Sequence, residues 1–495
     1  MSFFGQVEFD INPNLNFAGG IRYDATAFVD AAEFNPLVYQ ELGIRTDEKP
    51  EDFDNIQPRF QLTWNVKGND TDILKIGGGV FTSQPHYYAQ VNNIQNSGTL
   101  LGAIDVTGTD VPTPDFIGYR NDPSTVSGVP AGVTPFSTIN AVSPDFEVPT
   151  IYKANINYTH FFGDRYSLGV NAVYSHTKNN YVYQETNLVA EPYFVTPQGR
   201  EVFVPANTIA ENGRADWTKS RVSDLVGRTL VLNSDGVLDN LALVVEGSAK
   251  IGEDGYVNAS FTVNQSKDNS SYNCCVANTS TFLPVSGDPR DLNYGYSDNH
   301  FDTKIVVNGA SPTWKGFALG ATIVGTGGTR YSLKSGGGRS ANGDFNLSNE
   351  IAYIFDPSDV NTPQYIKDSY NEVLNDPETS EGFKEYLKES FGSFAERNGG
   401  KNPFSTTVDL RLQKKFNLPN DKHSLELSAD VFNFMNLLNK EWGRSNNFGN
   451  RDFMNINGFD QATSSYQYNV QTGAGTEPIN GTPWRLQVGV RYSFN

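Results

Sequence analysis

Histidine is the residue that most often signals metal or acid–base chemistry, and in this chain the histidines are few and scattered. They are His86, His160, His176, His300 and His423, and none has a second histidine three or four residues away. Zinc sites usually need such local spacing. The sequence therefore predicts no metal site.

Cys274 and Cys275 are the only cysteines and are neighbours in the sequence. Two adjacent cysteines cannot build a disulfide framework or a four-ligand zinc site. A strained vicinal disulfide and two free loop thiols are both compatible with the sequence, and we favour the thiols.

A glycine-rich segment at 334–340 reads Lys-Ser-Gly-Gly-Gly-Arg-Ser. It lacks the Gly-Lys-Ser/Thr ending and the preceding strand of a phosphate-binding loop. We expect a flexible loop and no bound cofactor.

Charged residues at alternate positions of strand-like segments could form catalytic pairs or structural ion pairs. The acidic ones are Glu8, Asp24, Asp409, Glu426 and Asp430, and the basic ones are Arg22, Arg59, Arg411 and Arg491. We interpret them as a structural lattice of ion pairs on the polar faces of these segments rather than as a catalytic site. The chain is therefore predicted not to be an enzyme, although an enzyme stays open as a third alternative.

Aromatic residues in the long segments between strands are the remaining candidates for ligand binding. Tyr87, Tyr88, Trp217 and Trp442 could stack on sugars or peptides, or could equally fold the loops that carry them. The sequence assigns no residue a ligand-binding role.

The elements that carry these residues show strict alternation of apolar and polar side chains. In 57–66, Phe60, Leu62 and Trp64 share one face, whereas Arg59 and Gln61 share the other. The pattern predicts strands at 3–11, 15–24, 57–66, 73–82, 150–161, 166–176, 240–250, 255–265, 300–309, 315–325, 404–416, 423–434 and 484–494. Most approach the ~9 to 11 residues that a tilted strand needs to cross a bilayer.

Composition excludes two other classes of protein. No run approaches the ~18 to 20 apolar residues of a membrane-spanning helix. The 37 basic and 56 acidic residues give a net charge of −19, the wrong sign for a nucleic-acid partner. Tyr (24) and Phe (33) far outnumber Met (3), a profile typical of strands and of membrane boundaries.

The connections alternate in length, which favours a transmembrane barrel over a sandwich or a propeller. Short turns are expected near 12–14, 67–72, 162–165, 251–254, 310–314 and 417–422, with long segments between them. Short periplasmic turns and long extracellular loops are typical of outer-membrane barrels. Alternation alone would also suit a soluble sheet, so the loop lengths decide.

The expected number of strands is odd, whereas a complete bacterial barrel has an even number. The N-terminus, Met1 to Glu8, also lacks the basic and apolar regions of a signal peptide. We therefore expect the rear portion of a longer protein, with an open, curved sheet or a forced closure of 3–11 against 484–494.

One long segment contains a helical pattern. Phe383, Tyr386, Leu387 and Phe391 recur at helical spacing after Ser380-Glu381. The sequence predicts one short loop helix that ends at Asn398-Gly399-Gly400. We expect it to pack over its own loop rather than to bind a partner.

Several short segments resemble TonB-dependent outer-membrane receptors. Gly20 to Asp24, 395–398, Val408 to Phe416, 429–439 and Val488 to Phe494 are similar to that family, and 429–439 resembles its Oar-like branch. The resemblance spans nearly all of residues 1–495 and implies an all-β, antiparallel transmembrane barrel, of which these are about 13 of 22 strands. The family usually ends in an aromatic residue, whereas here Asn495 follows Phe494.

The resemblance also implies location, partners and function. It places the chain in the cell outer membrane, in contact with lipid, and predicts uptake of a large or scarce extracellular solute. Energy would come from the TonB complex through an N-terminal plug and TonB box that have no counterpart in this sequence. A passive porin-like or adhesive barrel is the alternative.

Overall fold

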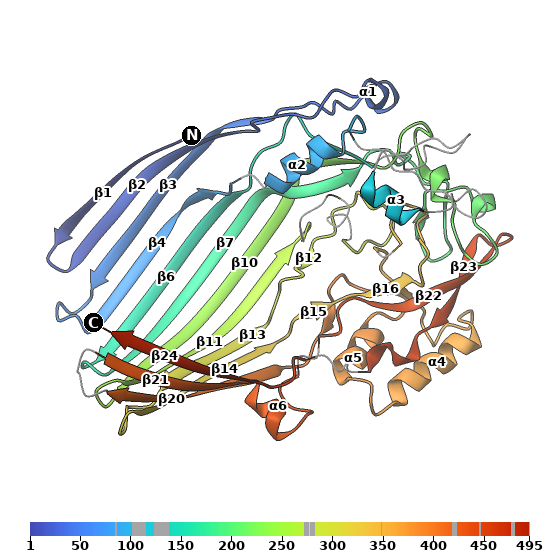
Figure 1. The fold of residues 1–495 in the computed structure, drawn as a ribbon. Helices are drawn as coiled ribbons and strands as arrows, with labels where there is room; N and C mark the ends of the chain where they lie inside the picture. Colours follow the sequence, from blue (N-terminus) through green and yellow to red (C-terminus); the bar gives the residue numbers. More distant parts are fainter. Residues whose placement is uncertain are drawn as a thin grey trace.

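A computed structural model describes residues 1–84, 87–100, 115–122, 138–271, 277, 283–347, 349–417, 423–444, 447–476 and 481–494. One large antiparallel sheet dominates it, and its strands follow one another in chain order (Figure 1). The order is β1 (Ser2–Asn12), β2 (Leu15–Ala27), β3 (Glu51–Asn65), β4 (Asp72–Thr82), β6 (Thr150–Phe162), β7 (Tyr166–Glu185), β10 (Thr229–Ile251), β11 (Gly255–Asp268), β13 (Thr303–Ala310), β14 (Phe317–Gly327), β20 (Ser405–Asn417), β21 (His423–Phe432) and β24 (Arg485–Phe494). Each of the thirteen predicted ranges overlaps one of these strands.

The sheet is curved but not closed. β1 pairs only with β2 and β24 only with β21, and Figure 1 shows these two strands at opposite edges of the sheet. The expectation of an open sheet is confirmed, and forced closure does not occur. Each outer strand therefore presents a row of unpaired backbone groups.

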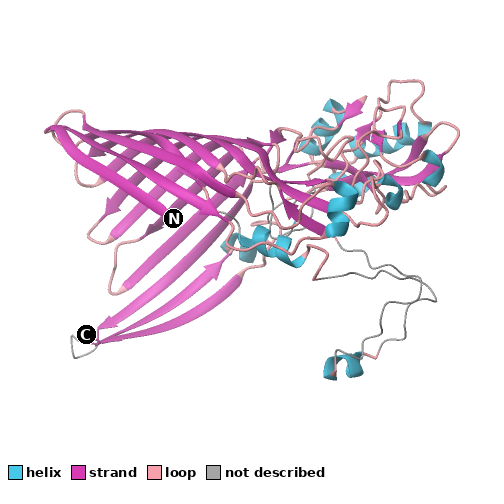
Figure 2. Cartoon of the chain, turned by 90° about the horizontal axis from the view of Figure 1, so that it is seen from above, coloured by secondary structure: helices cyan, strands magenta, loops and turns pink. Residues whose placement is uncertain are grey.

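Short turns join the strands at one end of the sheet, and the long connections gather at the other end (Figure 2). Two strands are longer than predicted, because β7 and β10 continue to pair up to Leu230 and Glu185. At ~3.3 Å per residue, the 20 residues of β7 exceed the thickness of a bilayer. There, β5 (Ile139–Val142) adds to β10 in parallel.

The register places the predicted polar and apolar residues on opposite faces. Arg411 lies opposite Asp430, which in turn lies opposite Gln487, whereas Leu412 shares the other face with Val488. Two hollows lie on the polar face, one around Arg59, Gln61 and Asn155 and one around Arg411, Gln413 and Asp430. The polar face is therefore the concave one, as predicted.

The apolar face is convex and uncovered. Val488 and Val490 are 70% and 69% exposed, and Phe60, Trp64 and Leu412 are also exposed. A protein surrounded by water rarely leaves so large an apolar face open. Such exposure is what contact with lipid requires.

The loops fold into a body of their own, which we call the loop cap. Its buried cluster unites three connections, through Val202 to Ile209, Tyr331 to Ala395 and Phe448 to Val470. The small strands of the chain's connections are β8 (Phe194–Val195), β9 (Glu201–Val202), β12 (Gly295–Tyr296), β15 (Arg330–Tyr331), β16 (Leu333–Gly336), β17 (Tyr353–Ile354), β18 (Ser393–Phe394), β19 (Gly400–Lys401), β22 (Arg451–Asp460) and β23 (Ser465–Val470). A smaller cluster, which includes Phe28, Phe146, Tyr181 and Leu232, lies beside the outer parts of β7 and β10.

The prediction of one loop helix is wrong. The described residues contain six α-helices: α1 (Pro36–Leu42), α2 (Tyr87–Gln95), α3 (Phe116–Asn121), α4 (Gln364–Asn375), α5 (Glu381–Glu389) and α6 (Phe434–Leu438). None is long and apolar enough to span a membrane. The predicted helix is α5, and it packs Phe383, Tyr386 and Leu387 into the cap as expected.

The predicted end of α5 is also wrong. The helix ends at Glu389, and Ser390 donates its backbone N–H to the last turn. Gly400 instead belongs to β19, where a Cβ would lie 2.5 Å from the Tyr331 ring. This glycine serves close packing rather than helix termination.

The expectation of a flexible loop at 334–340 is also wrong. Leu333–Gly336 is strand β16, paired in parallel with β22, and Ser335 and Ser340 are buried. Gly337 and Gly338 have φ values of 78° and 73°, so the chain turns there. A distant strand orders a segment that looks flexible in isolation.

The convex face generates a stability prediction. Val488→Arg should destabilise the membrane-inserted sheet by ~2 to 4 kcal/mol, because it places a charge near the bilayer midplane. Gln487→Arg, one residue away on the concave face, is the matched control and should cost far less. Urea unfolding in lipid vesicles measures both; equal losses would contradict the assignment of faces.

Candidate functional site

The polar concave face of the large sheet, which we call the wall, carries rows of hydrogen-bonded polar side chains that cross several strands. Arg22 Nε lies 2.8 Å from Asp24 Oδ2, and Gln57 also donates to Asp24 and, at 2.9 Å, to Thr82. Arg59 donates to Gln57 Oε1 at 2.7 Å. These contacts line a hydrophilic surface from β2 to β4.

The other edge of the sheet has a second group. Arg411 lies 3.3 Å from Asp430 and 3.7 Å from Glu426, as the predicted ion-pair lattice required. Asp409 does not join it, because Asp409 accepts the Asn433 backbone N–H at 2.8 Å. The wall can thus solvate a polar solute along its length.

Besides Asp409, three residues of the predicted lattice have no ion pair in the described part of the chain. Arg59 binds Gln57 and lies 4.4 Å from the centroid of the Phe81 ring. Glu8 accepts from Asn16 at 3.4 Å, and Arg491 lies on the polar face opposite Glu426. For these residues the prediction of ion pairs is wrong. Arg59 and Glu8 have neutral or aromatic partners instead.

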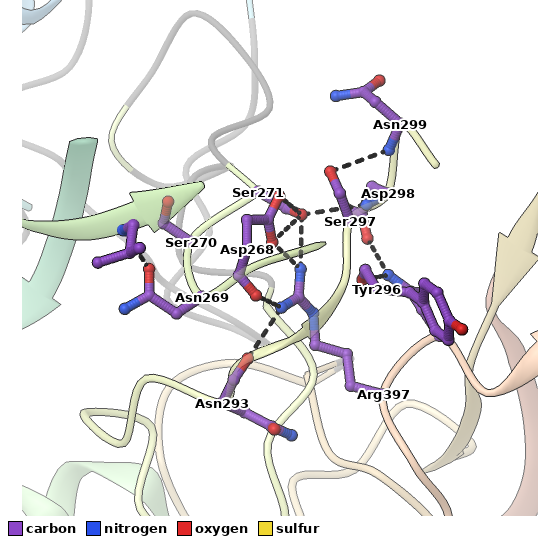
Figure 3. Close-up of polar contacts among 12 residues, drawn as sticks. Asp268, Asn269, Ser270, Ser271, Asn293, Tyr296, Ser297, Asp298, Asn299 and Arg397 are labelled. Carbon is purple, nitrogen blue, oxygen red and sulfur yellow. Dashed lines mark hydrogen bonds and ion pairs between the residues drawn. The ribbon is translucent and has the colours of Figure 1, made fainter. Parts of the chain in front are cut away.

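A buried arginine fixes the loop cap to the mouth of the wall. Figure 3 shows Arg397 enclosed by Asp268 and Ser271 at the end of β11 and by Asn293. Its guanidinium pairs with the Asp268 carboxylate and donates to the backbone carbonyls of Asp268 and Asn293 at 2.7 and 2.8 Å. Both partners of the ion pair are almost fully buried.

The next residue extends this contact. Asn398 has a left-handed backbone with φ of 56°, and its Nδ2 donates to Tyr296 O and Asp298 Oδ1, both at 2.7 Å. Its N–H donates to Ser332 Oγ at 2.9 Å. Arg397 and Asn398 therefore join the connections that follow β11 and β14.

A second anchor surrounds Asp302, at the start of β13. Arg330 and His300 lie 2.8 Å from Asp302 Oδ1, and Lys401 pairs with Oδ2. His300 Nδ1 accepts the Ser266 N–H at 3.0 Å, so Nε2 carries the proton that is donated to Asp302. Burial lowers the pKa of His300, which keeps the imidazole neutral.

The carboxyl at this anchor stays ionised. Burial alone would raise the pKa of Asp302, but the hydrogen bonds from Lys401, His300 and Arg330 outweigh it and lower the pKa to about 2. Asp302 is thus a fixed negative charge that holds three segments together.

Two of the remaining histidines also contact carboxylates, whereas His423 Nδ1 contacts the Tyr492 hydroxyl. His160 Nδ1 lies 2.7 Å from Asp72, and His176 Nδ1 lies 2.9 Å from Asp239. Within the described ranges no three His, Cys, Asp or Glu side chains cluster as metal ligands. His86, Cys274 and Cys275 lie outside the described residues.

The candidate aromatics divide into two kinds. Trp217 packs on Phe345 with 4.8 Å between ring centroids and under the Arg221 guanidinium, so it helps to fold its loop. Tyr87, Tyr88 and Trp442 are exposed and remain accessible. The polar wall therefore lies beneath the folded loop cap. Tyr87, Tyr88 and Trp442 are the candidate aromatics that are exposed to a ligand.

The sequence analysis missed the anchors. Arg397 enters it only through a resemblance, Asn398 through that resemblance and as the expected end of a helix, and Asp268 and Asp302 do not enter it. A charged residue at the loop end of an alternating strand, as Asp268 is for β11 and Asp302 for β13, is the available signal.

Comparison with known proteins agrees with this architecture. A family model described as an outer membrane beta barrel domain matches residues 1–471. The chain belongs to this family. It is accordingly an outer-membrane barrel protein.

This outer-membrane barrel chain also resembles solved structures. They include the outer membrane transporter YddB of Escherichia coli (13% identity, 99% of this chain and 45% of that chain, TM-score 0.48) and the FrpB iron transporter of Neisseria meningitidis, F3-3 variant (8%, 99% and 44%, 0.47). The pyoverdine receptor FpvA of Pseudomonas aeruginosa PAO1 is a third (10%, 100% and 42%, 0.42). The chain spans less than half the length of each. A search of curated proteins gives no match.

The Arg397 anchor of the outer-membrane barrel generates a prediction. Arg397→Ala should destabilise the loop cap by ~3 to 5 kcal/mol, because it leaves the Asp268 carboxylate buried without its partner. Arg444→Ala, which removes a loop ion pair with Glu441, should cost ~1 kcal/mol or less. Urea unfolding in detergent followed by near-UV circular dichroism measures both. Equal costs would contradict the anchoring role.

The Asp302 anchor predicts a dependence on pH. Folding lowers the pKa of this carboxyl, so its stabilisation is present above pH ~4 and is lost as the pH falls through ~2. Asp302→Asn should remove on the order of 1 kcal/mol of stability at pH 7, allowing for partial exposure, and should flatten the loss on acidification. The exposed Asp235→Asn is the control. Identical acid profiles for wild type and Asp302→Asn would refute the assignment.

Proposed function

We propose that this outer-membrane barrel is the wall and outer surface of a receptor that takes up a large or scarce solute. The observation that carries the proposal is the combination of a polar concave wall with a folded loop cap anchored at its mouth. A simple diffusion pore needs the wall but does not need a cap with its own buried core. A receptor needs a shaped outer surface above a hydrophilic path.

The finer parts of the proposal rest on the sequence resemblance to TonB-dependent receptors of the Oar-like branch. We infer that residues 1–495 supply part of one barrel domain and that about nine further strands would complete a barrel of twenty-two. The unpaired edges of β1 and β24 support this, since unsatisfied backbone groups in lipid cost several kcal/mol each. A plug and a TonB-coupling segment would belong to the same longer protein.

A passive porin-like or adhesive barrel is the second candidate. Tyr87, Tyr88 and Trp442 are exposed aromatics that could bind a surface during adhesion. The same side chains could also capture a solute, so they are compatible with both candidates. Energy dependence separates the two candidates.

Uptake by cells is the test. A strain that carries the native gene and a strain that lacks it would be given labelled ferric siderophores, cobalamin and oligopeptides, with and without a protonophore. The proposal expects gene-dependent uptake of one class of solute that the protonophore abolishes. Gene-dependent uptake that survives the protonophore indicates a passive pore, and cell adhesion without uptake indicates an adhesin.

The isolated chain provides a second measurement. Residues 1–495 fused to a signal peptide should show no energy-dependent uptake and no heat-modifiable migration of a closed barrel, because both sheet edges lack partners. A stably inserted barrel with energy-dependent uptake would overturn the inference of further strands.

A further inference from the structure

A buried polar cluster lies in the loop cap, on the segment that joins β16 to β17. Oxygen-bearing side chains recur at Ser340, Asn342, Asp344 and Asn346 and again at Asn349 and Glu350. Each of these six residues is at most 5% exposed. Two carboxylates are thus enclosed within the same short stretch of chain.

Asp344 is at the centre of the cluster. Its Oδ1 accepts the Asn346 N–H at 2.7 Å and lies 3.3 Å from Ser340 Oγ, and its Oδ2 lies 3.0 Å from Asn349 Nδ2. A glycine turn at Gly343, with φ of 77°, lets the chain fold around this carboxylate.

Glu350 lies close enough to Asp344 for the two charges to interact. Its Oε1 accepts the Ala341 N–H at 2.7 Å, but its Oε2 is buried and has no hydrogen-bond partner. The Oδ1 of Asn349 is also buried and without a partner. Two buried oxygens beside Asp344 are therefore unsatisfied, although such atoms almost always find a partner.

Neither carboxylate forms an ion pair with a basic side chain within the described part of the chain. Arg200 acts on Glu350 through its charge, but its guanidinium donates to the backbone carbonyls of Ser286 and Ile351. Arg228 acts on Asp344 through its charge, but its guanidinium is paired with Glu185. Burial raises the pKa of both carboxyls, and the charge of Asp344 raises that of Glu350 further.

We propose that Asp344 and Glu350, with oxygens of Ser340 and Asn349, form a binding site for a divalent hard cation, Ca²⁺. Two carboxylates match a charge of +2. Glu350 Oε2 and Asn349 Oδ1, a carboxylate and an amide oxygen without hydrogen-bond partners, are of the ligand types that Ca²⁺ accepts. Adjacent oxygens 2.8 to 3.3 Å apart, as among Ser340, Asn342 and Asp344, fit around an ion with Ca–O distances of ~2.4 Å. The neutral ligands and the size of the oxygen cage disfavour Mg²⁺, which keeps its waters.

A path to the site exists. Ser340, Phe345 and Asn346 line a surface hollow of about 570 Å³ whose opposite side includes Trp217 and Arg214. The hollow therefore brings the solvent to Ser340 and Asn346 at the edge of the cluster, where an ion could enter.

The position of the site gives the ion a structural effect. Asn342 Nδ2 donates to Gly287 O at 3.0 Å, and Asn342 O accepts the Phe203 N–H at 2.7 Å. The cluster thus joins segments from three connections. Binding of Ca²⁺ would stabilise the cap as a whole by binding the folded form alone.

Thermal unfolding of the full chain refolded in detergent tests the proposal. At 2 mM CaCl₂ the midpoint of the cap transition should rise by ~2 to 4 °C over that in EGTA, and MgCl₂ should give little change. Glu350→Gln should abolish the response to Ca²⁺, whereas the exposed Glu372→Gln should retain it. If the pair is only a strained buried contact, wild type will not respond to Ca²⁺ and Glu350→Gln will be more stable in EGTA; that result overturns the proposal.

Terbium luminescence provides a readout that does not depend on unfolding. Tb³⁺, a luminescent substitute for Ca²⁺, should be sensitised by Trp217, which packs on Phe345 of the same segment. The signal should be displaced by excess Ca²⁺ and lost in Asp344→Asn, provided that circular dichroism shows the variant to be folded. If Asp344→Asn does not fold, Asn349→Ala replaces it, with the same loss expected. A displaceable signal that persists in a folded variant would refute the site.

Discussion

The pairing of backbone N–H and C=O groups within the sheet is the constraint on which the rest of this molecule depends. A lipid environment offers no hydrogen bonds, so each strand must take its partners from its neighbours. In the continuous antiparallel ladder from β1 to β24, each strand between the two edge strands pairs with a neighbour on both sides, whereas β1 and β24 each pair on one side. Because the backbone is satisfied by pairing alone, the side chains are free to differ on the two faces. That freedom allows an apolar convex face and a polar concave face in one sheet.

The molecule follows opposite rules in its two parts. In the wall, large apolar side chains such as Leu486 and Val488 point away from the protein and are exposed. In the loop cap, Leu333, Phe383 and Phe453 are fully buried, as in a protein surrounded by water. The boundary between the parts is crossed by charged anchors, Arg397 with Asp268 and Asp302 with Arg330, Lys401 and the neutral His300. Buried ion pairs are specific in direction, so they suit a junction that must hold the cap in one orientation above the wall.

The sequence predicts the wall well because the wall is governed by a local rule. Alternation at Phe60, Leu62 and Trp64 needs no knowledge of distant residues, and all thirteen ranges overlap strands. The cap depends on contacts between residues far apart in the chain. From the sequence alone, Gly400 is predicted to end a helix, but in the structure it packs against Tyr331. Ser335 is predicted to lie in a flexible loop, but its strand pairs with β22. Helix α4 is absent from the predicted elements, although Ile366, Tyr370 and Val373 recur at the spacing of a buried helix face. The sequence analysis expects a helix in this connection only at α5. The anchors escaped detection for the same reason: Asp268 and Arg397 are 129 residues apart.

The shared core of the loop cap bears on how such a surface diversifies. Because connections that follow β7, β14 and β21 bury their apolar residues against one another, none of them is an independent unit. If a single connection were replaced by that of a relative, its apolar residues would not fit those of the other two connections, and the shared core would be disrupted. Recombination or grafting would therefore succeed only if the three connections were exchanged together. The sequences of these connections should change together when binding specificity changes, whereas the sequences of the strands beneath them can change independently.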